Sequence, residues 1–221
     1  MQELASEAGI FYLMRWGHFL SGIAWIGLLY YFNFVQGEYF KVADPAARND
    51  AFVKLVPRAL LWFRMAAAVT FLTGLVMLGF IGMGLTIDIT IGATLGTLMF
   101  LNVWLIIWPN QRILIRSNEG IKAGNAALPE AAAAAAKAGL ASRTNTLFSI
   151  PMLYVMGSST HLSSGPLSSA SGAAVGVVLL IIAALEANAI FGKQGPMTTV
   201  NGVIGCGFGL WLVLYAVIKI L

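Results

Sequence analysis

The sequence predicts an all-α protein that crosses a membrane about six times, and two observations lead to this prediction. Apolar residues make up 59% of the 221 residues and charged residues only 10%, a composition that no soluble domain of this size needs. Six segments also carry the roughly 20 mostly apolar residues that a helix needs to cross about 30 Å of hydrocarbon. They lie near 10–34, 59–83, 88–108, 145–162, 172–192 and 198–220. We therefore expect residues 1–221 to form a single polytopic helical bundle in contact with the lipid bilayer.

The first predicted helix, near 10–34, is expected to stay in the mature protein. A cleavable signal peptide has a basic start and a short apolar core. This chain opens instead on the acidic "MQELASEAG", and the apolar run that follows is too long for such a core. The second and third helices, near 59–83 and 88–108, follow the connection 35–58.

The segment between the third and fourth helices, 109–144, is the one sizeable polar connection. Pro109 in "WPNQRI" is expected to stop the third helix. Further along, "LPEAAAAAAKAGL" predicts a short surface helix on the cytoplasmic side. Pro129 suits a first helical turn, alanine has the highest helix propensity, and Gly139 can close the end.

The last three helices contain residues that are less usual inside a membrane. The helix near 145–162 includes Pro151 and many hydroxyl side chains, and neighbouring helices can satisfy the backbone groups that a proline frees. The helix near 172–192 is almost wholly apolar. The last helix repeats small residues, which allow close helix packing or contact with another subunit: Gly202, Gly205, Cys206 and Gly209.

The distribution of Lys and Arg predicts the orientation. Ten of the 13 fall in the connections 35–58, 109–144 and 193–197, which lie on one face of the membrane if six helices alternate. Because cytoplasmic connections are enriched in Lys and Arg, we expect both termini on the outer side of a bacterial inner membrane. This topology explains the net charge of +4, so nothing argues for nucleic-acid binding.

The chain has only two histidines, His18 and His161, and both are predicted near the outer surface. His18 lies about eight residues into the first helix, which is about 12 Å deep at 1.5 Å per residue. His161 lies at the end of the fourth helix. Since haem iron takes axial histidines, the sequence predicts a haem b whose iron is bound by both.

Three residues near His18 suit a flat apolar ligand. Arg15, one turn before the histidine, could pair with a haem propionate. Gly22 and Trp25 continue the same stripe of the helix, where Gly22 permits close approach and Trp25 offers an apolar wall. Cys206 is the only cysteine, so haem attached through thioether bonds is excluded.

Other interpretations of the histidines stay open. One of them alone could hold the cofactor, or His18 could simply hydrogen-bond across helices while His161 is an exposed loop residue. Two histidines cannot complete a three-ligand zinc or copper centre unless carboxylates or another subunit contribute.

Two charged residues fall inside predicted helices. Arg64 lies near the inner end of the second helix and Glu186 in the inner half of the fifth. A pair between them would offset the cost of burying either charge alone. The alternatives are that both side chains reach the cytoplasmic surface, or that Glu186 serves a proton path. Asn102 and Asn188 could belong to the same polar layer.

Three separated blocks carry a family resemblance, and together they span roughly residues 10–162: "HFLSGIAWIGLLYYFNFVQ", "WPNQRI" and "SRTNTLFSIPMLYVMGSSTH". They resemble the N-terminal membrane domain of the bacterial membrane-bound urate oxidase (urate hydroxylase) family. The His-x-x-x-Gly-x-x-Trp-x-Gly pattern of the first block is distantly similar to the copper-resistance CopD proteins and the HemJ-type protoporphyrinogen oxidases. The resemblance implies functional roles for His18 and His161, which lie in the first and third blocks.

The resemblance also suggests partners. Full-length members of that family end in a cytochrome c domain that passes electrons to the respiratory chain, whereas this sequence contains no haem c motif. A separate cytochrome or other membrane subunits are therefore expected as partners. The first hypothesis is a haem b-binding redox module or subunit of an electron-transfer assembly. The alternatives are a urate-oxidising enzyme that uses a separate cytochrome c, and a non-catalytic accessory subunit of a larger membrane complex.

Overall fold

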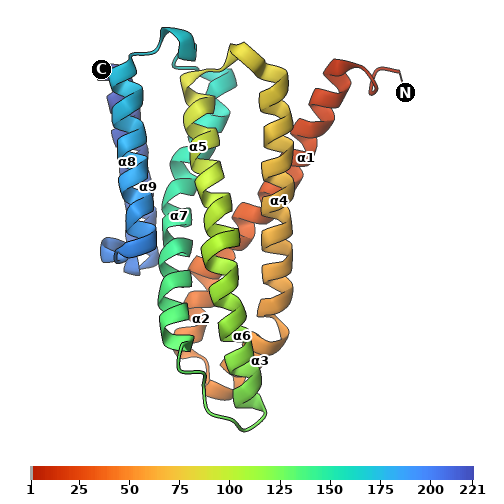
Figure 1. Ribbon diagram of the computed structural model, residues 1–221, viewed down its shortest axis with the longest axis vertical. Coiled ribbons are helices and arrows are strands. Elements are labelled where there is room, and N and C mark those ends of the chain that lie inside the picture. The colour runs from red at the N-terminus through yellow and green to blue at the C-terminus, as the bar shows by residue number, and fades with distance from the viewer. Residues whose placement is uncertain (1) are drawn as a thin grey trace.

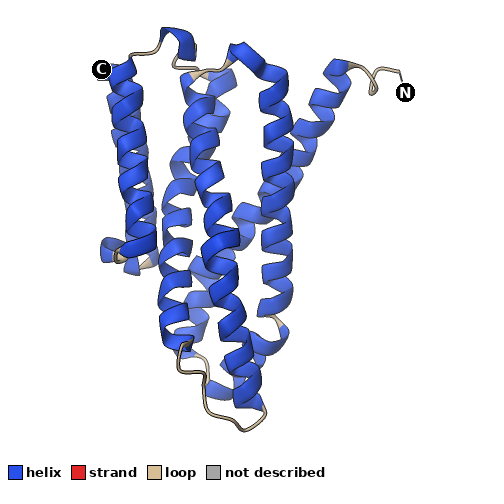
Figure 2. Ribbon diagram, in the orientation of Figure 1, coloured by secondary structure: helices blue, strands red, loops and turns tan. Residues whose placement is uncertain are grey.

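The computed structural model describes residues 2–221, which form helices and connecting loops with no strand among them (Figures 1 and 2). Five helical segments are long and apolar enough to span a membrane: Glu7–Val42, Val56–Gly84, Ile87–Lys122, Gly172–Phe191 and Val200–Ile220. A further long helix, α7 (Ala131–His161), runs through the bundle. The all-α membrane bundle predicted from the sequence is confirmed. Five of the six predicted spans correspond to these five segments, and the one near 145–162 lies in α7.

The spanning segments are built from shorter elements. In chain order the elements are α1 (Glu7–Tyr30), η1 (Tyr31–Gln36), α2 (Gly37–Val42), α3 (Pro45–Lys54), α4 (Val56–Ile81), η2 (Gly82–Gly84), α5 (Ile87–Leu101), η3 (Asn102–Ile107), α6 (Trp108–Lys122), α7, η4 (Leu167–Ser169), α8 (Gly172–Phe191), η5 (Gly195–Thr198) and α9 (Val200–Ile220). The segments η1 and η3 are π-helical, and η2, η4 and η5 are 3₁₀-helical.

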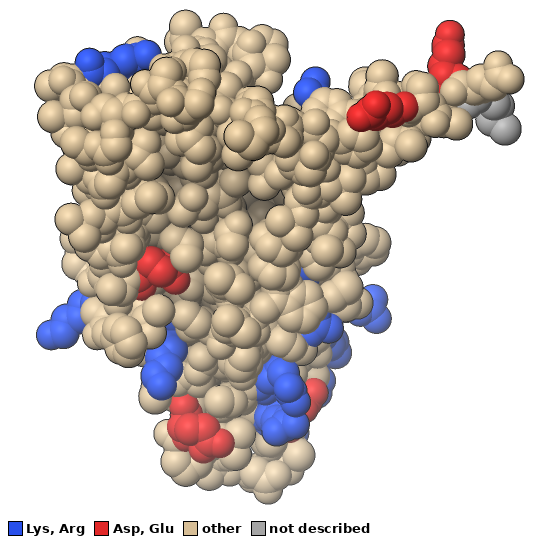
Figure 3. Space-filling view, turned by 45° about the horizontal axis from the view of Figure 1, so that its top comes forward, with Lys and Arg blue, Asp and Glu red and all other residues tan. Residues whose placement is uncertain are grey.

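Both chain termini lie at one end of the bundle, together with the loops after α4 and α7 (Figure 1). The opposite end holds the connections around α3 and between α6 and α7. We call this second end the basic end, because nine of the 13 Lys and Arg residues fall in 35–58 and 109–144, and Figure 3 shows several of the Lys and Arg side chains there. The alternation of helices expected from the charge pattern is therefore the alternation observed.

Two of the predicted helices are longer than expected, because each continues through a π-helical segment. The first runs from α1 through η1 into α2, and the third runs from α5 through η3 into α6. The prediction that Pro109 ends the third helix is wrong, since Pro109 lies in the first turn of α6. A π turn shifts the register of the backbone hydrogen bonds, so a proline without an N–H can follow it inside a continuous helix.

The alanine-rich segment does not form the separate surface helix that we expected. It is the beginning of α7, which continues through Gly139 and Pro151 to His161. Ala134, Ala138 and Ala141 in this part are buried. Packing of that face, rather than propensity alone, carries the helix past Gly139. The predicted fourth helix, 145–162, is thus the second part of a longer one.

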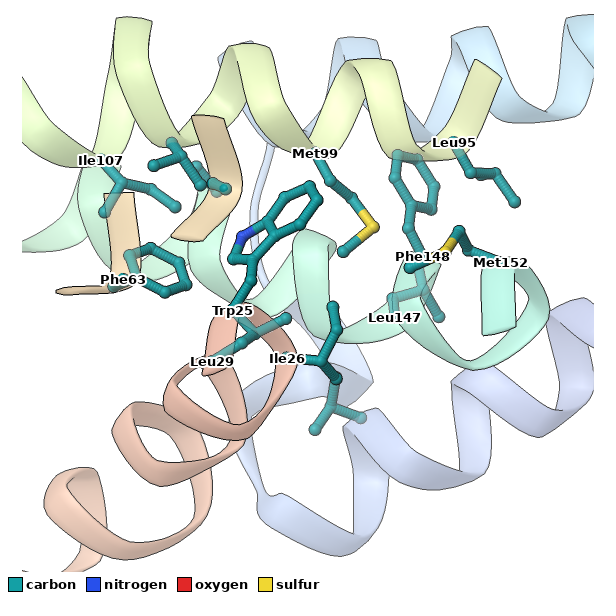
Figure 4. Close-up of a cluster of buried hydrophobic side chains, with 14 of the residues drawn as sticks. Trp25, Ile26, Leu29, Phe63, Leu95, Met99, Ile107, Leu147, Phe148 and Met152 are labelled. Atoms are coloured by element: carbon teal, nitrogen blue, oxygen red, sulfur yellow. The ribbon is translucent and has the colours of Figure 1, made fainter. Parts of the chain in front are cut away.

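Helix α7 carries many polar side chains and packs against many of the other helices. It contacts α5, α6 and α9 most extensively and also touches α1 and α8. Its polar side chains are enclosed by these neighbours rather than by lipid, and the buried ones are Arg143, Thr144, Asn145, Thr146, Ser149 and Ser158. The apolar core lies around them and includes Trp25, Leu29, Phe63, Met99 and Phe148 (Figure 4).

The small residues of α9 pack within the chain at Gly207, a position that the sequence interpretation left out. A Cβ at Gly207 would collide with the side chain of Ile150 on α7, whereas Gly209 has nothing within 4 Å. We expect Gly207→Leu to lower the free energy of unfolding by about 1–3 kcal/mol, because the new side chain must displace Ile150 from a packed interface. Unfolding in SDS, followed by circular dichroism, measures the loss. Gly209→Leu is the matched control, and an equal loss in both variants would contradict the packing role.

Asp50 fastens α3 to α6 at the basic end. Its Oδ1 lies 2.7 Å from Lys54 Nζ and 3.3 Å from Lys122 Nζ. The hydrogen bond from Lys54 is the largest cause that lowers the pKa of Asp50, and Lys122 adds to it. Because the folded-state pKa lies below the unfolded one, the stabilisation is present above the unfolded pKa and is lost as the pH falls through the folded pKa.

We therefore expect the protection of α3 amides against hydrogen exchange to decrease in acid, after correction for the intrinsic effect of pH. Asp50→Asn should remove most of that pH dependence, because the asparagine does not titrate. The same acid-induced loss of protection in the variant and the wild type would show that another group controls this contact.

Candidate functional site

His18 lies on α1 where that helix packs against α4. His18 Nδ1 is 3.2 Å from Thr73 Oγ1, and the imidazole is half-buried. A Cβ at Gly74 would lie 3.3 Å from His18 Cε1. The absence of a side chain at Gly74 therefore leaves room for the ring.

The Thr73 hydroxyl favours the His18 tautomer that is protonated at Nδ1. Its only hydrogen is directed to the helix backbone, with Thr73 Oγ1 2.7 Å from the Val69 carbonyl oxygen and 3.0 Å from that of Thr70. The hydroxyl oxygen can then accept a hydrogen bond from His18 Nδ1–H. In that tautomer Nε2 carries a free lone pair, which is the state in which histidine binds a metal ion.

The other residues of the α1 stripe face α4 and the core. Ser21 Oγ accepts a hydrogen bond of 2.8 Å from Thr70 Oγ1, and a Cβ at Gly22 would lie 4.0 Å from the Thr70 methyl group. Trp25 is 2% exposed and packs in the core together with Met99 (Figure 4). Gly22 and Trp25 therefore contact protein, and Trp25 belongs to the core of the bundle.

Arg15 and His161 are both exposed. The Arg15 guanidinium carbon lies 4.7 Å from the centroid of the Phe11 ring. His161 is the last residue of α7, and its side chain makes no hydrogen bond to any of residues 2–221. The same residues contain no group of three or more His, Cys, Asp and Glu side chains that could hold a metal ion. The structure thus gives His18 its neighbours on α4, and an iron shared with His161 stays a prediction.

The predicted ion pair between Arg64 and Glu186 is wrong. Within residues 2–221 the ion pairs are Lys41–Glu38, Lys54–Asp50 and Lys122–Asp50. The Arg64 guanidinium carbon lies 3.7 Å from the centroid of the Trp108 ring, and Glu186 Oε2 accepts a 3.1 Å hydrogen bond from Asn102 Nδ2. The η3–α6 segment supplies a partner to each side chain, a cation–π contact for one and an amide for the other, so they do not meet.

Glu186 belongs to a polar cluster that joins three helices, formed by Asn102, Asn145 and Glu186, which we call the amide cluster. Asn102 Nδ2 also donates to Asn145 Oδ1 at 2.9 Å, and Asn145 Nδ2 donates to the Met99 carbonyl at 2.9 Å. Both asparagines are buried, and Asn102 Oδ1 has no hydrogen-bond partner. The expectation that Asn102 shares a layer with Glu186 is confirmed. Asn188 does not, because its side chain bonds to the backbone of Lys193.

Each π-helical segment brings an asparagine to α7. Asn102 begins η3, and Asn33 in η1 donates from Nδ2 to Ser142 Oγ at 2.8 Å. One turn before Asn33, Tyr30 Oη lies 2.9 Å from Ser149 Oγ on α7. π turns are rare and often occur at functional sites, so this side of α7 is a second candidate region. The signal in the sequence was a lone asparagine in each of two apolar helices.

Asp88 is a buried acid that the sequence reasoning missed. Its Oδ1 accepts from Ser158 Oγ at 2.7 Å and from Ser164 Oγ at 3.3 Å, and its Oδ2 accepts from the Ser164 N–H at 2.6 Å. These bonds tie the loop after α7 to the first turn of α5. An acid in a first turn is an ordinary helix start, so the sequence pattern does not distinguish a buried acid there from an exposed one.

Comparison with known families decides the relationship. The family model described as "Urate oxidase N-terminal" matches residues 81–191, half of the chain. The chain belongs to the urate oxidase N-terminal family. No curated protein and no solved structure gives a match. The resemblance to the urate oxidases is confirmed, and the distant likeness to the CopD and HemJ proteins stays a prediction.

The segment that matches the urate oxidase N-terminal family runs from the last residue of α4 to the end of α8. It includes Asp88, His161 and the whole amide cluster. His18 lies outside it, on α1. The urate oxidase N-terminal match therefore coincides with the polar interior around α7, while the histidine with the free nitrogen is contributed by the helix that packs beside it.

Proposed function

We propose that this chain is a haem b-binding membrane module or subunit of an assembly that oxidises urate and passes the electrons on. The family supplies the link to urate oxidation. The observation that carries the redox role is the 3.2 Å contact between His18 Nδ1 and Thr73 Oγ1, which leaves Nε2 available to a ligand. The membrane is proposed to be a bacterial inner membrane, with the basic end in the cytoplasm.

Residues near His18 are suited to hold one face of a haem b. His18 would bind the iron through Nε2. Its other ring nitrogen, Nδ1, would donate a hydrogen bond to Thr73, and such a bond orients metal-bound histidines. Arg15 is exposed one turn nearer the chain terminus, where its guanidinium can pair with a propionate. His161 remains the proposed second ligand. When bound, haem b would supply one-electron transfer.

The buried polar side chains around α7 favour a functional subunit over a purely structural one. Buried ionisable side chains are costly in a membrane and are functional-site hypotheses by default. The amide cluster and the bonds of Asn33 and Tyr30 to α7 exceed what packing of apolar helices requires. We therefore favour this hypothesis over that of a non-catalytic accessory subunit.

Urate-driven electron transfer in membranes tests the proposal. Membranes that contain the chain with its native partners and a c-type cytochrome are expected to reduce that cytochrome when urate is added. His18→Ala should lose the reduction, whereas Phe19→Ala, which removes an exposed side chain of the same helix, should keep it. Full urate-dependent reduction in the His18→Ala membranes would overturn the redox role of this histidine.

A further inference from the structure

Glu186 is an acidic residue with no cation beside it. It lies in α8 five residues before the end at Phe191, which is about 8 Å along the axis at 1.5 Å per residue. None of the ion pairs within residues 2–221 includes it. An ionised carboxylate at that depth, held by one neutral donor, is costly, and a protonated carboxyl is not.

The charged side chains on the helices around Glu186 do not pair with it among the described residues. The helices that pack against α8 are α5, α7 and α9. Within residues 2–221, the hydrogen bond that Glu186 accepts comes from Asn102. Among the described residues, the charged and histidine side chains of those three helices form no ion pair or hydrogen bond with Glu186: Asp88, Lys137, Arg143, His161 and Lys219.

The hydrogen bonds of the amide cluster leave two acceptor oxygens without a donor. Both hydrogens of Asn102 Nδ2 are used, one by Asn145 Oδ1 and the other by Glu186 Oε2. Asn102 Oδ1 is buried and unpartnered, and Glu186 Oε1 accepts no hydrogen bond from any of residues 2–221. A carboxylic acid has an O–H donor that a carboxylate lacks, so protonation of Glu186 adds the kind of group that the cluster is missing.

Asn102 is held firmly enough to fix the carboxyl. Its amide is anchored by Asn145, which is in turn anchored to the Met99 carbonyl. It stands at the start of η3, where the helix widens against α7. The chain therefore presents a fixed neutral donor to one oxygen of Glu186 and leaves the other oxygen for a proton.

We infer that Glu186 is an intramembrane proton-binding site, held in place by Asn102 and filled from the basic end. Water or a buffer acid donates the proton: its bond to hydrogen breaks, and hydroxide or the buffer base keeps the electron pair. The new O–H bond forms at Glu186 Oε1, the oxygen that accepts no hydrogen bond from Asn102. The basic end is the nearer end of α8, so the cytoplasm supplies the proton under the orientation proposed above. The site itself does not depend on haem or on urate.

Infrared spectroscopy of the purified chain in lipid nanodiscs tests this inference. Exposed carboxyls have an ordinary pKa of about 4, so near pH 6.5 the C=O stretch of a protonated carboxylic acid should come from a buried group. We expect such a band, shifted in D₂O and absent from Glu186→Gln. Asn102→Leu should keep the band but move it, because the carbonyl oxygen loses its hydrogen bond.

Glu119→Gln, which changes an exposed acid, is the matched control and should leave the band as it is. A spectrum that Glu186→Gln does not change would overturn the inference. Loss of the Glu186 band on adding sodium chloride, with no such loss in choline chloride, would identify a sodium site and overturn it too. Since no redox change is needed, a haem-free protein can still show the band, and the two proposals fail separately.

Discussion

Replacing Asp88 with alanine is expected to lower the free energy of unfolding by about 3 kcal/mol. Hydrogen bonds to charged groups are each worth about 1.5–3 kcal/mol, and a buried donor left without a partner adds a penalty. Asp88 is 2% exposed and accepts from Ser158 and from both the backbone and the hydroxyl of Ser164. The substitution also removes a negative charge from the first turn of α5, where the helix dipole favours it.

Unfolding in SDS measures the stability of the Asp88 variant, and hydrogen exchange over 162–171 reports the anchoring of the loop. Asp88→Asn keeps one acceptor oxygen and should lose less than Asp88→Ala. Glu119→Ala, at an exposed position, controls for the loss of an acid. A change of less than about 0.5 kcal/mol in Asp88→Ala, the range of ordinary surface substitutions, would show that these bonds do not hold the loop.

The second large effect is expected in the centre of the bundle, for Asn145→Leu. Leucine has a similar size but leaves the Met99 carbonyl and one hydrogen of Asn102 Nδ2 without their present partners. Unsatisfied buried polar groups cost about 1–3 kcal/mol each, so we expect a loss of about 3 kcal/mol. Asn118→Leu is the matched control, because the Asn118 amide bonds to a carbonyl of its own helix.

A double-mutant cycle separates the amide cluster from simple packing. Since Asn102 and Asn145 share a hydrogen bond, the loss in the Asn102→Leu/Asn145→Leu double variant should be smaller than the sum of the single losses. Strict additivity in SDS unfolding would mean that the two amides act independently.

The positions of the five apolar helices were predictable because apolar length decides whether a segment can cross a bilayer. Their ends were not, because a π turn changes backbone hydrogen bonding without a change in composition. Pro109 looked like a stop signal for that reason, yet it follows η3 inside a continuous helix. Gly139 likewise lies within α7 because the alanines around it are packed.

The candidate site was predictable only in part. Periodicity placed His18, Gly22 and Trp25 on one stripe of α1, but which helix covers a stripe is decided by tertiary packing, and α4 covers much of it. Depth alone suggested pairing Arg64 with Glu186. Depth does not specify the position around the helix axis, and the aromatic ring of Trp108 competes for the guanidinium.

The most direct test of the redox proposal is the reduced-minus-oxidised optical spectrum of the purified protein, with haem quantified by the pyridine haemochrome assay. We predict a haem b spectrum that is lost in His18→Ala and in His161→Ala, and that is weakened in Thr73→Val because the imidazole loses its orienting hydrogen bond. A haem-free wild type, produced with ample haem and its native partners, would contradict the proposal, as would an unchanged spectrum in His18→Ala.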